Sequence, residues 1–332
     1  MKPKAVISIH REFEGQVFTE REIAAIGEMT DLGGLYTDPE AILKDDGLMG
    51  ELNIVFAGWG SLVADEKFLS RAPNFKAMFG ACGSVRPITS EAFWKRDDLI
   101  VTSAAHANAI PVAEYCLSTI LFSLKLGWRH IRRTKAERSW RWEPSAPGGF
   151  RSTVGLVSLG EIGRKTLELL RPFDLDVCVY STSMSEEKAR ELGVRRLSLE
   201  DLFAQADVIS IHTPDLPATK GMIHRGLLER MKSDATLINS ARGAVIDQEA
   251  LLEVWKERPD LTAVLDVVLP DPPTPESKLY DYDNIILTPH IAGSMYGETR
   301  RLAQYAIDAC REFLEGKTPE HTVTKKQFER MA

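Results

Sequence analysis

Residues 153–164 read Thr-Val-Gly-Leu-Val-Ser-Leu-Gly-Glu-Ile-Gly-Arg, and this stretch decides the fold. Its first six residues are largely apolar and rich in β-branched side chains, which is typical of a buried parallel strand. Gly160 and Gly163 follow, and the apolar positions after them recur at helical spacing. The stretch therefore predicts a strand, a glycine turn and a helix in direct succession.

A strand–turn–helix unit of this kind is suited to bind a pyrophosphate. Backbone N–H groups at the start of the helix point towards the ligand, and the helix dipole favours its negative charge. The common fingerprint is Gly-x-Gly-x-x-Gly, and in this chain Ser158 stands in place of the first glycine. We expect a nucleotide site formed by Ser158, Gly160, Glu161, Ile162 and Gly163. The alternative is an ordinary glycine-containing turn.

The bulk composition narrows the class of protein. A chain of 332 residues suggests two domains. The net charge of −7 and the pI of about 5.6 argue against nucleic acid or an anionic membrane as the main partner. We interpret a local basic cluster at 129–141 as a solvated or subunit-facing helix end.

The cysteines indicate a reducing compartment, and the apolar segments match neither a signal peptide nor a membrane span. The cysteines are far apart and lack partners at metal-ligand spacing, so we expect free thiols and no metal: Cys82, Cys116, Cys178 and Cys310. The first ten residues are too briefly apolar for a signal peptide, and the run 112–124 is too short and polar to span a membrane. We therefore expect a cytoplasmic protein.

Hydrophobic patterning predicts two series of alternating strands and helices, and hence parallel sheets. In the first series we expect strands at 5–9, 53–57, 75–79 and 99–102, and helices at 19–29 and 64–72. In the second we expect strands at 153–158, 176–180, 207–212, 235–239, 261–267 and 284–288, and helices at 185–192, 199–205 and 247–257. Six strands with helices between them complete a doubly wound nucleotide-binding domain.

The remaining segments predict how the two series are connected. Residues 110–133 have the pattern of one long helix, and 140–149 that of an irregular arm. The helix predicted at 294–315 follows the last strand and is long, so we expect it to return to the first series. The predicted fold class is α/β, with two Rossmann-like doubly wound parallel-sheet domains. One is discontinuous and flavodoxin-like, at 1–103 plus 294–332, and the other spans 104–293.

Three polar residues come directly after expected strands of the second series: Arg242, Asp271 and His290. In open α/β sheets, ligands bind outside the carboxyl ends of the strands. We therefore expect these side chains to face the crevice at which the glycine turn opens.

At this point the sequence resembles a known family. The motifs at 108–115, 158–163, 212–214, 231–247, 265–267 and 288–293 are similar to those of D-2-hydroxyacid dehydrogenases, such as phosphoglycerate dehydrogenase and glyoxylate/hydroxypyruvate reductase. The resemblance is good over 100–315 and loose before residue 80. It implies a substrate-binding first domain and an NAD(P)-binding second domain. It also implies a homodimer through residues 105–150, where Trp128, Trp140 and Trp142 fit an interface.

The resemblance implies that NAD(P)H reduces the carbonyl of a 2-oxo acid. His290 would be the general acid and base, since imidazole exchanges protons near neutral pH. Asp271 would orient His290, and Arg242 would bind the substrate carboxylate and polarise the carbonyl. Each has a structural alternative: His290 as a satisfied strand-end histidine, Arg242 as an ion-pair partner, and Asp271 as a turn residue. The last alternative is open because the family usually has Glu at this position.

The resemblance also assigns cofactor contacts beyond the glycine turn. They are Ser181, Thr182, His212, Thr213, Pro214, Ser240, Ala241, Arg242, Asp266, His290 and Gly293, with Asp266 facing the nicotinamide carboxamide. An NAD-dependent enzyme usually has an acidic residue where Ser181 stands, and an NADP-dependent one has an arginine nearby. Because this turn has neither, the choice between NAD(H) and NADP(H) stays open.

Substrate contacts are expected on loops of the first domain as well. The resemblance points to Trp59, Gly83, Ser84, Val85, Arg86 and Asn108, together with Arg242 and His290. Gly83 and Val85 would offer backbone N–H groups to a carboxylate. Arg86 either contacts a second acidic group or faces solvent, and Trp59 either narrows the pocket or has a packing role. Asn108 either touches substrate, acts at a hinge or caps a helix.

Two other functions are compatible with these motifs. The family includes non-catalytic corepressors that sense NAD(H), and phosphite-type dehydrogenases share the fold. Arg242 and His290 favour catalysis over a binding module. The predicted substrate is a small 2-oxo or 2-hydroxy acid whose side chain the sequence does not specify.

Overall fold

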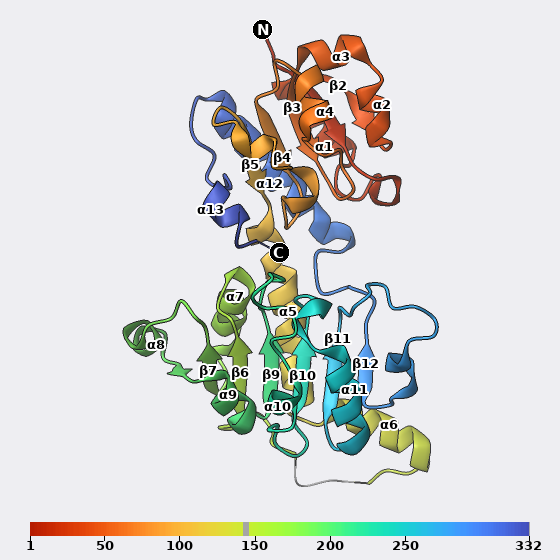
Figure 1. The fold of residues 1–332 in the computed structure, drawn as a ribbon, viewed down its shortest axis with the longest axis vertical. Coiled ribbons are helices and arrows are strands. Elements are labelled where there is room, and N and C mark those ends of the chain that lie inside the picture. The colour runs from red at the N-terminus through yellow and green to blue at the C-terminus, as the bar shows by residue number, and fades with distance from the viewer. Residues whose placement is uncertain (142–145, 332) are drawn as a thin grey trace. The chain divides into compact units, whose positions relative to one another are not determined.

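The computed structural model describes residues 1–141 and 146–331, which fold into two compact units. Unit 1 comprises Met1–Ala109 and Ser294–Ala332, and unit 2 comprises Ile110–Gly293. Each unit is built on one parallel sheet with helices on both faces (Figure 1). The predicted α/β class with two doubly wound parallel sheets is therefore confirmed.

Unit 1 has a five-stranded sheet with the order β2-β1-β3-β4-β5. The strands are β1 (Lys4–Ser8), β2 (Asp31–Tyr36), β3 (Leu52–Ala57), β4 (Ala77–Gly80) and β5 (Ile100–Ser103). This order is that of a flavodoxin-like sheet. Strand β2 is missing from the sequence prediction, because Gly33 and Gly34 interrupt its apolar pattern.

Apolar side chains on both faces of this sheet bind the helices of unit 1. Helices α1 (Glu20–Met29) and α12 (Thr299–Leu314) pack on one face. Helices α2 (Pro39–Leu43), α3 (Asp46–Glu51) and α4 (Glu66–Arg71) pack on the other. Helix α1 starts with a capping box formed by Thr19 and Glu22. Helix α12 returns the chain to unit 1, although it begins at Thr299 rather than at residue 294.

Unit 2 has a seven-stranded sheet with the order β12-β11-β10-β9-β6-β7-β8. The strands are β6 (Thr153–Val157), β7 (Asp176–Tyr180), β8 (Arg195–Arg196), β9 (Val208–Ile211), β10 (Thr236–Asn239), β11 (Thr262–Leu265) and β12 (Ile285–Leu287). The expected count of six strands was wrong, because the edge strand β8 has only two residues and no apolar pattern. The order in which the chain adds strands reverses between β6 and β9, and such folds bind ligands at this switch point.

Helices cover both faces of the unit 2 sheet. Helix α7 (Glu161–Leu170), α8 (Glu186–Leu192) and the second part of α5 (Ala105–Ser123) contribute to the apolar core on one face. Helices α9 (Leu199–Gln205), α10 (Arg225–Leu228) and α11 (Gln248–Glu257) contribute to the core on the other. The strands β6, β10, β11 and β12 all run in the same direction. The loops that follow them therefore lie at one edge of the sheet.

The single helix expected at 110–133 was wrong. The chain forms α5 and α6 (Gly127–Glu137), which meet at an angle of 56°. Leu126 between them has φ +52°, and an added Cβ at Gly127 would lie 2.3 Å from the ring of Phe122. Close packing of the ring against a glycine therefore breaks the helix. In the described part of the chain no single helix is long and apolar enough to cross a membrane, and α5 and α6 pass that test only together across their bend.

The basic cluster lies mainly on α6, and several of its members pair within unit 2. Arg129 pairs with Asp234, and Arg132 donates to the carbonyl of Asp283 at 2.6 Å. Of the expected arm at 140–149, residues 142–145, including Trp142, lie outside the described residues. The rest of the arm has no helix or strand.

Candidate active site

The turn after β6 has the geometry of an anion-binding helix start. Ser158 has φ +80°, a left-handed conformation that favours glycine, so the serine keeps the backbone path of the missing first glycine. An added Cβ at Gly163 would lie 2.5 Å from the carbonyl oxygen of Ser158 and would push α7 away from the turn. An added Cβ at Gly160 meets no atom within 4 Å. The start of α7, with Glu161 and Ile162 in its first turn, therefore opens to space that a phosphate can enter.

His212 lies beside this turn and is a second sign of a ligand. Its Cβ is 3.6 Å from the position of an added Cβ at Gly163. The ring is buried, and neither of its nitrogens has a hydrogen-bond partner among the described residues. Burial lowers the pKa of His212 to about 4, so the ring is neutral at pH 7. Because unpartnered buried polar groups are unfavourable, the open turn and this ring together fit a bound dinucleotide.

Two further expected cofactor residues follow His212. Thr213 is buried, and its hydroxyl donates to the carbonyl of Val157 at 3.3 Å, which fixes the segment to the end of β6. Pro214 is half-buried and directly follows it.

The end of β7 presents hydroxyl groups. Ser181 is buried, with its Oγ 3.2 Å from the Oγ of Ser183, and Thr182 between them is exposed. Both arginines of the adjacent strand β8 pair with carboxylates of their own unit: Arg195 with Asp176 at 2.7 Å and Arg196 with Glu186 at 2.8 Å. This corner therefore holds neither the acid of an NAD site nor an unpaired arginine of β8.

Arg242 lies in the turn after β10 and is half-buried. The buried Asn239 ties this turn, because its Oδ1 accepts from the N–H of Ala241 and its Nδ2 donates to the carbonyl of Arg242, both at 3.0 Å. An added Cβ at Gly243 would lie 2.1 Å from the backbone carbonyl of Val268. Glycine is required at this position because the loops after β10 and β11 touch there.

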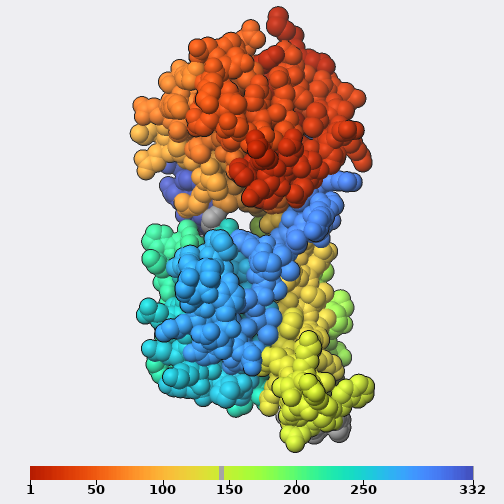
Figure 2. Space-filling model, turned by 90° about the vertical axis from the view of Figure 1, so that its right-hand side faces the viewer, coloured from red at the N-terminus to blue at the C-terminus, as the bar shows by residue number. Residues whose placement is uncertain are grey.

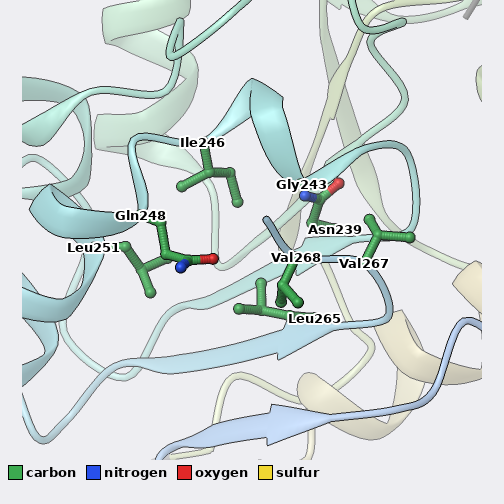
Figure 3. Close-up of a pocket in the computed structure, with 8 residues that line it drawn as sticks. All are labelled: Asn239, Gly243, Ile246, Gln248, Leu251, Leu265, Val267 and Val268. Atoms are coloured by element: carbon green, nitrogen blue, oxygen red, sulfur yellow. The ribbon is translucent and has the colours of Figure 1, made fainter. Parts of the chain in front are cut away.

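The loop after β11, which carries Asp271, includes Val267 and Val268, and Gln248 lines the same small cavity as these two residues (Figure 3). Gln248 at the start of α11 donates through Nε2 to the carbonyl of Leu269 at 2.9 Å and accepts at Oε1 from its N–H at 3.2 Å. A cavity of about 10 Å³ remains between Gln248, Gly243 and Val268. It has room for one water at most, so it is not a substrate pocket.

His290 and Asp271 form a hydrogen bond with Nδ1 and Oδ2 2.9 Å apart. Their side chains are 53% and 35% exposed, so ligands can reach them. His290 has φ +55°, and its N–H donates to the carbonyls of Asp266 and Thr288, both at 3.0 Å. Because Nδ1 is bonded to the carboxylate, Nε2 is the nitrogen left to exchange a proton with a ligand.

The buried carboxylate of Asp266 organises the loop that carries His290. Its Oδ1 accepts from the hydroxyl of Thr288 at 2.6 Å and from the N–H of Ile291 at 2.9 Å. Its Oδ2 accepts from the N–H of Ala292 at 2.9 Å. The residue expected to face the nicotinamide therefore has most of its acceptor capacity engaged in holding this loop, which ends at Gly293.

Side chains of helix α5 contact the residues that follow β10 and β12. The hydroxyl of Tyr115 lies 2.9 Å from that of Thr288, and the Sγ of Cys116 lies 3.1 Å from the Oγ of Ser240. Burial raises the pKa of Tyr115, and it raises that of Cys116 to about 11, so both stay protonated at neutral pH. The four cysteines are free, as predicted, and the structure buries all of them. No His, Cys, Asp or Glu cluster within 1–141 and 146–331 is arranged to hold a metal.

In unit 1 the residues after β4 form a loop with a series of backbone donors. An added Cβ at Gly83 would lie 3.4 Å from Nδ2 of Asn108, whose Oδ1 accepts from the N–H of Ser294 at 2.9 Å. Asn108 therefore packs against the loop and anchors the start of the returning segment. In the part of the chain that the structure describes, the N–H groups of Gly83 and Ser84 donate to no protein acceptor.

Arg86 and Trp59 have partners within unit 1. The Arg86 guanidinium binds backbone carbonyls of residues 328–331, a partner that the sequence did not indicate. Trp59 is partly buried, with its ring centre 5.1 Å from that of Phe13. The structure therefore gives both side chains a packing role.

The structure brings Arg242, Asp271 and His290 to adjacent loops of unit 2. It also shows three residues that hold these loops and that the sequence analysis missed: Asn239, Gln248 and Thr288. Asn239 and Thr288 lie at strand ends inside motifs of the family, which was a usable signal. Gln248 carried none, because a glutamine in the first turn of a helix is usually solvated.

A Rossmann-type sheet, an open glycine turn and a histidine–carboxylate pair define a dinucleotide-binding α/β protein. Residues 119–292, more than half of the chain, match the family model described as D-isomer specific 2-hydroxyacid dehydrogenase, NAD binding domain. The chain belongs to this family and carries its NAD binding domain.

Individual relatives agree with this family. The chain is 30% identical over 233 residues to D-3-phosphoglycerate dehydrogenase from Archaeoglobus fulgidus, covering 69% of this chain and 44% of that one. It is 32% identical over 194 residues to glyoxylate reductase from Aeropyrum pernix, covering 56% and 58%. The chain spans about half the length of the curated relatives it matches. A phosphoglycerate oxidoreductase structure from Rhizobium etli has the same fold, with a TM-score of 0.81, 19% identity, and 98% and 99% coverage.

Proposed function

We propose that this protein is an NAD(P)H-dependent oxidoreductase that reduces a small 2-oxo acid to the D-2-hydroxy acid and catalyses the reverse oxidation. The observation that carries the proposal is the 2.9 Å hydrogen bond between His290 and Asp271. A histidine oriented by a carboxylate at the carboxyl ends of parallel strands is what general acid–base chemistry requires. The family and the names of the relatives support the same class of reaction.

His290 supplies the proton in the direction of reduction. The carbonyl oxygen gains negative charge as the carbon accepts a hydride, and the imidazolium transfers its Nε2 proton to that oxygen. Asp271 holds the ring through Nδ1 and stabilises the cationic form before the transfer. In the oxidation, Nε2 accepts the proton from the substrate hydroxyl.

Arg242 binds the carboxylate of the acid and polarises its carbonyl. A planar guanidinium can make two parallel hydrogen bonds to a carboxylate. Burial lowers the pKa of Arg242, whereas Asp215 and Asp271 act in the opposite direction, and the group stays charged because guanidinium pKa values lie so high. Among the described residues, Nη1 is the only guanidinium nitrogen of Arg242 with a hydrogen-bond partner, the carbonyl of Ala241 at 2.7 Å, so other donors remain for substrate.

The loop after β4 offers further donors to a carboxylate. The backbone N–H groups of Gly83 and Ser84 donate to no acceptor among the described residues, and that of Val85 follows them in the same loop. Backbone N–H groups are hydrogen-bond donors, so the carboxylate oxygens of an acid are suitable acceptors for them.

The cofactor would be held by residues of unit 2. The turn of Ser158, Gly160, Glu161, Ile162 and Gly163 would receive the pyrophosphate, and His212 would gain a hydrogen-bond partner. The nicotinamide supplies or accepts the hydride when it is bound. Ser181 and Thr182 present no carboxylate that would repel a 2′-phosphate, so both NADH and NADPH are expected to bind.

The test is a panel of 2-oxo acids of increasing size, each assayed with NADH and NADPH, in the wild type and in His290→Asn. We expect turnover of at least one acid, reduced about 10²-fold or more in the variant, with cofactor affinity unchanged. Cofactor binding without turnover of any acid would indicate a sensing module instead. Oxidation of phosphite as the only activity would indicate the phosphite-type alternative.

We also propose a homodimer that forms through residues 105–150. Helix α6 lies at the surface of unit 2 (yellow-green in Figure 2). Large apolar side chains are exposed there: Phe122, Ile131, Trp140 and Phe150. Large apolar side chains left exposed to water favour self-association. Sedimentation of the wild type and of Ile131→Asp tests this, and a wild type that remains monomeric at micromolar concentration would contradict it.

A further inference from the structure

Residues 324–331, which we call the strap, pack on the loop to which the proposed function assigns the substrate carboxylate. Arg86 holds the strap in place. Its Nε donates to the carbonyl of Met331 at 2.6 Å, and its Nη2 donates to those of Phe328 and Glu329 at 3.2 and 3.4 Å. The guanidinium also lies over the ring of Phe328, 4.9 Å from its centre.

The rest of the strap is ordered by contacts within unit 1. Thr324 and Gln327 form a capping box at the start of the short helix α13 (Lys325–Phe328). The N–H of Val323, just before the strap, donates to the carbonyl of Val101 in β5 at 2.9 Å. The ring of Phe328 lies 4.7 Å from that of Trp94. Sheet, aromatic ring and guanidinium therefore fix the position of Met331.

Met331 accepts a hydrogen bond from one of the backbone N–H groups to which the proposed function assigns the substrate carboxylate. The buried N–H of Val85 donates to Sδ of Met331 at 3.3 Å. A thioether sulfur is a weak acceptor, whereas a carboxylate oxygen makes stronger, charge-assisted hydrogen bonds. The neighbouring N–H groups of Gly83 and Ser84 donate to no acceptor among the described residues. The loop therefore presents two open donors and a third that is only weakly held.

We propose that Met331 is a residue of the substrate site that competes with the carboxylate of the acid for the N–H of Val85. The thioether holds this donor in the free protein and yields it when the acid binds, so the strength of its contact tunes substrate affinity. Arg86 is a positioning residue that holds Met331 there and is not itself a substrate ligand. This inference rests on the proposed function, because it takes the bound ligand to be a 2-oxo acid.

Two substitutions of similar size separate competition from simple packing. Met331→Gln places a strong amide acceptor near Val85, and we expect it to weaken binding of oxamate, an unreactive 2-oxo acid mimic, by about fivefold. Met331→Leu keeps the volume without an acceptor, and we expect it to strengthen binding by about threefold. Calorimetry of the full chain with saturating NADH gives both dissociation constants. In the Arg86→Ala background, where the strap is released, both effects should disappear.

A direct readout uses the methionine methyl groups. In protein labelled with [methyl-¹³C]methionine, oxamate should shift the Met331 signal, assigned by its loss in Met331→Leu. In Arg86→Ala the signal should have its released position before oxamate is added. Oxamate binding of equal affinity in wild type, Gln and Leu variants, with an unmoved Met331 signal, would overturn this inference alone. No binding of oxamate or of any active acid would overturn the proposed function with it.

Discussion

Nδ1 of His290 lies 2.9 Å from Oδ2 of Asp271, although the family usually has the longer glutamate at the aspartate position. The shorter side chain reaches the ring because contacts with the loop after β10 and with α11 position the loop that carries Asp271. Gly243 lets the loops after β10 and β11 touch, and Gln248 binds both backbone polar groups of Leu269. The distance between His290 and Asp271 therefore depends on how these backbone contacts position the loop, and not on side-chain length alone.

Asp271→Asn should lower kcat for reduction by about 10²-fold, because an amide keeps the size of the side chain and loses the charge that stabilises an imidazolium. Asp271→Glu should lower kcat by less, about tenfold, because it keeps the negative charge although the loop is positioned for a shorter side chain. Steady-state kinetics with a saturating acid would measure both. Wild-type kcat in Asp271→Asn would rule out the role of the carboxylate.

Asp266→Asn should destabilise the protein by about 2–3 kcal/mol and lower activity as well. The amide presents one acceptor oxygen where the carboxylate binds the hydroxyl of Thr288 and the N–H groups of Ile291 and Ala292, so a buried donor loses its partner. Urea denaturation gives the free energy of unfolding. Tyr115→Phe, which removes only the outer bond to Thr288, is the matched control and should cost about 1 kcal/mol. Equal losses in the two variants would contradict this hierarchy.

The stability of the cofactor-free protein should fall as the pH decreases from 6.5 to about 4, with His212 as one cause. Burial holds the pKa of His212 at about 4 in the folded chain, below the ordinary value of 6.5, so the unfolded chain binds the proton first. The stabilisation is complete above pH 6.5 and is lost towards pH 4, amounting to about 3 kcal/mol. Urea titrations at a series of pH values should show a shallower pH dependence in His212→Gln. An unchanged slope in that variant would assign the pH dependence to other groups.

Ser181→Asp should convert a tolerant cofactor site into one selective for NADH. A carboxylate at the end of β7 can bind the ribose hydroxyls of NAD and repels a 2′-phosphate. We expect the affinity for NADPH to fall about tenfold or more, with that for NADH unchanged or improved. Fluorescence titration with both cofactors measures this, and Ser183→Ala controls for loss of the Ser181–Ser183 contact alone. An already large NADH preference in the wild type would contradict our interpretation of Ser181.

The sequence predicted the elements that have strong local patterns. Strand β6, the glycine turn and α7 were expected from a continuous apolar run and the glycines that follow it. Elements without such a pattern were missed. Strand β8 consists of two arginines at a sheet edge, and the break between α5 and α6 comes from Phe122 packing over Gly127.

For the candidate site, the sequence by itself determined which side chains follow which parallel strands. Arg242, Asp271 and His290 could therefore be selected together, because strand order and direction place their loops at one edge. Only the tertiary structure decided what holds them there and what else occupies the donors. The bonds of Asp266 to the His290 loop and of Met331 to Val85 join residues 25 and 246 positions apart. Contacts of this kind depend on packing between distant segments, and local sequence pattern carries no record of them.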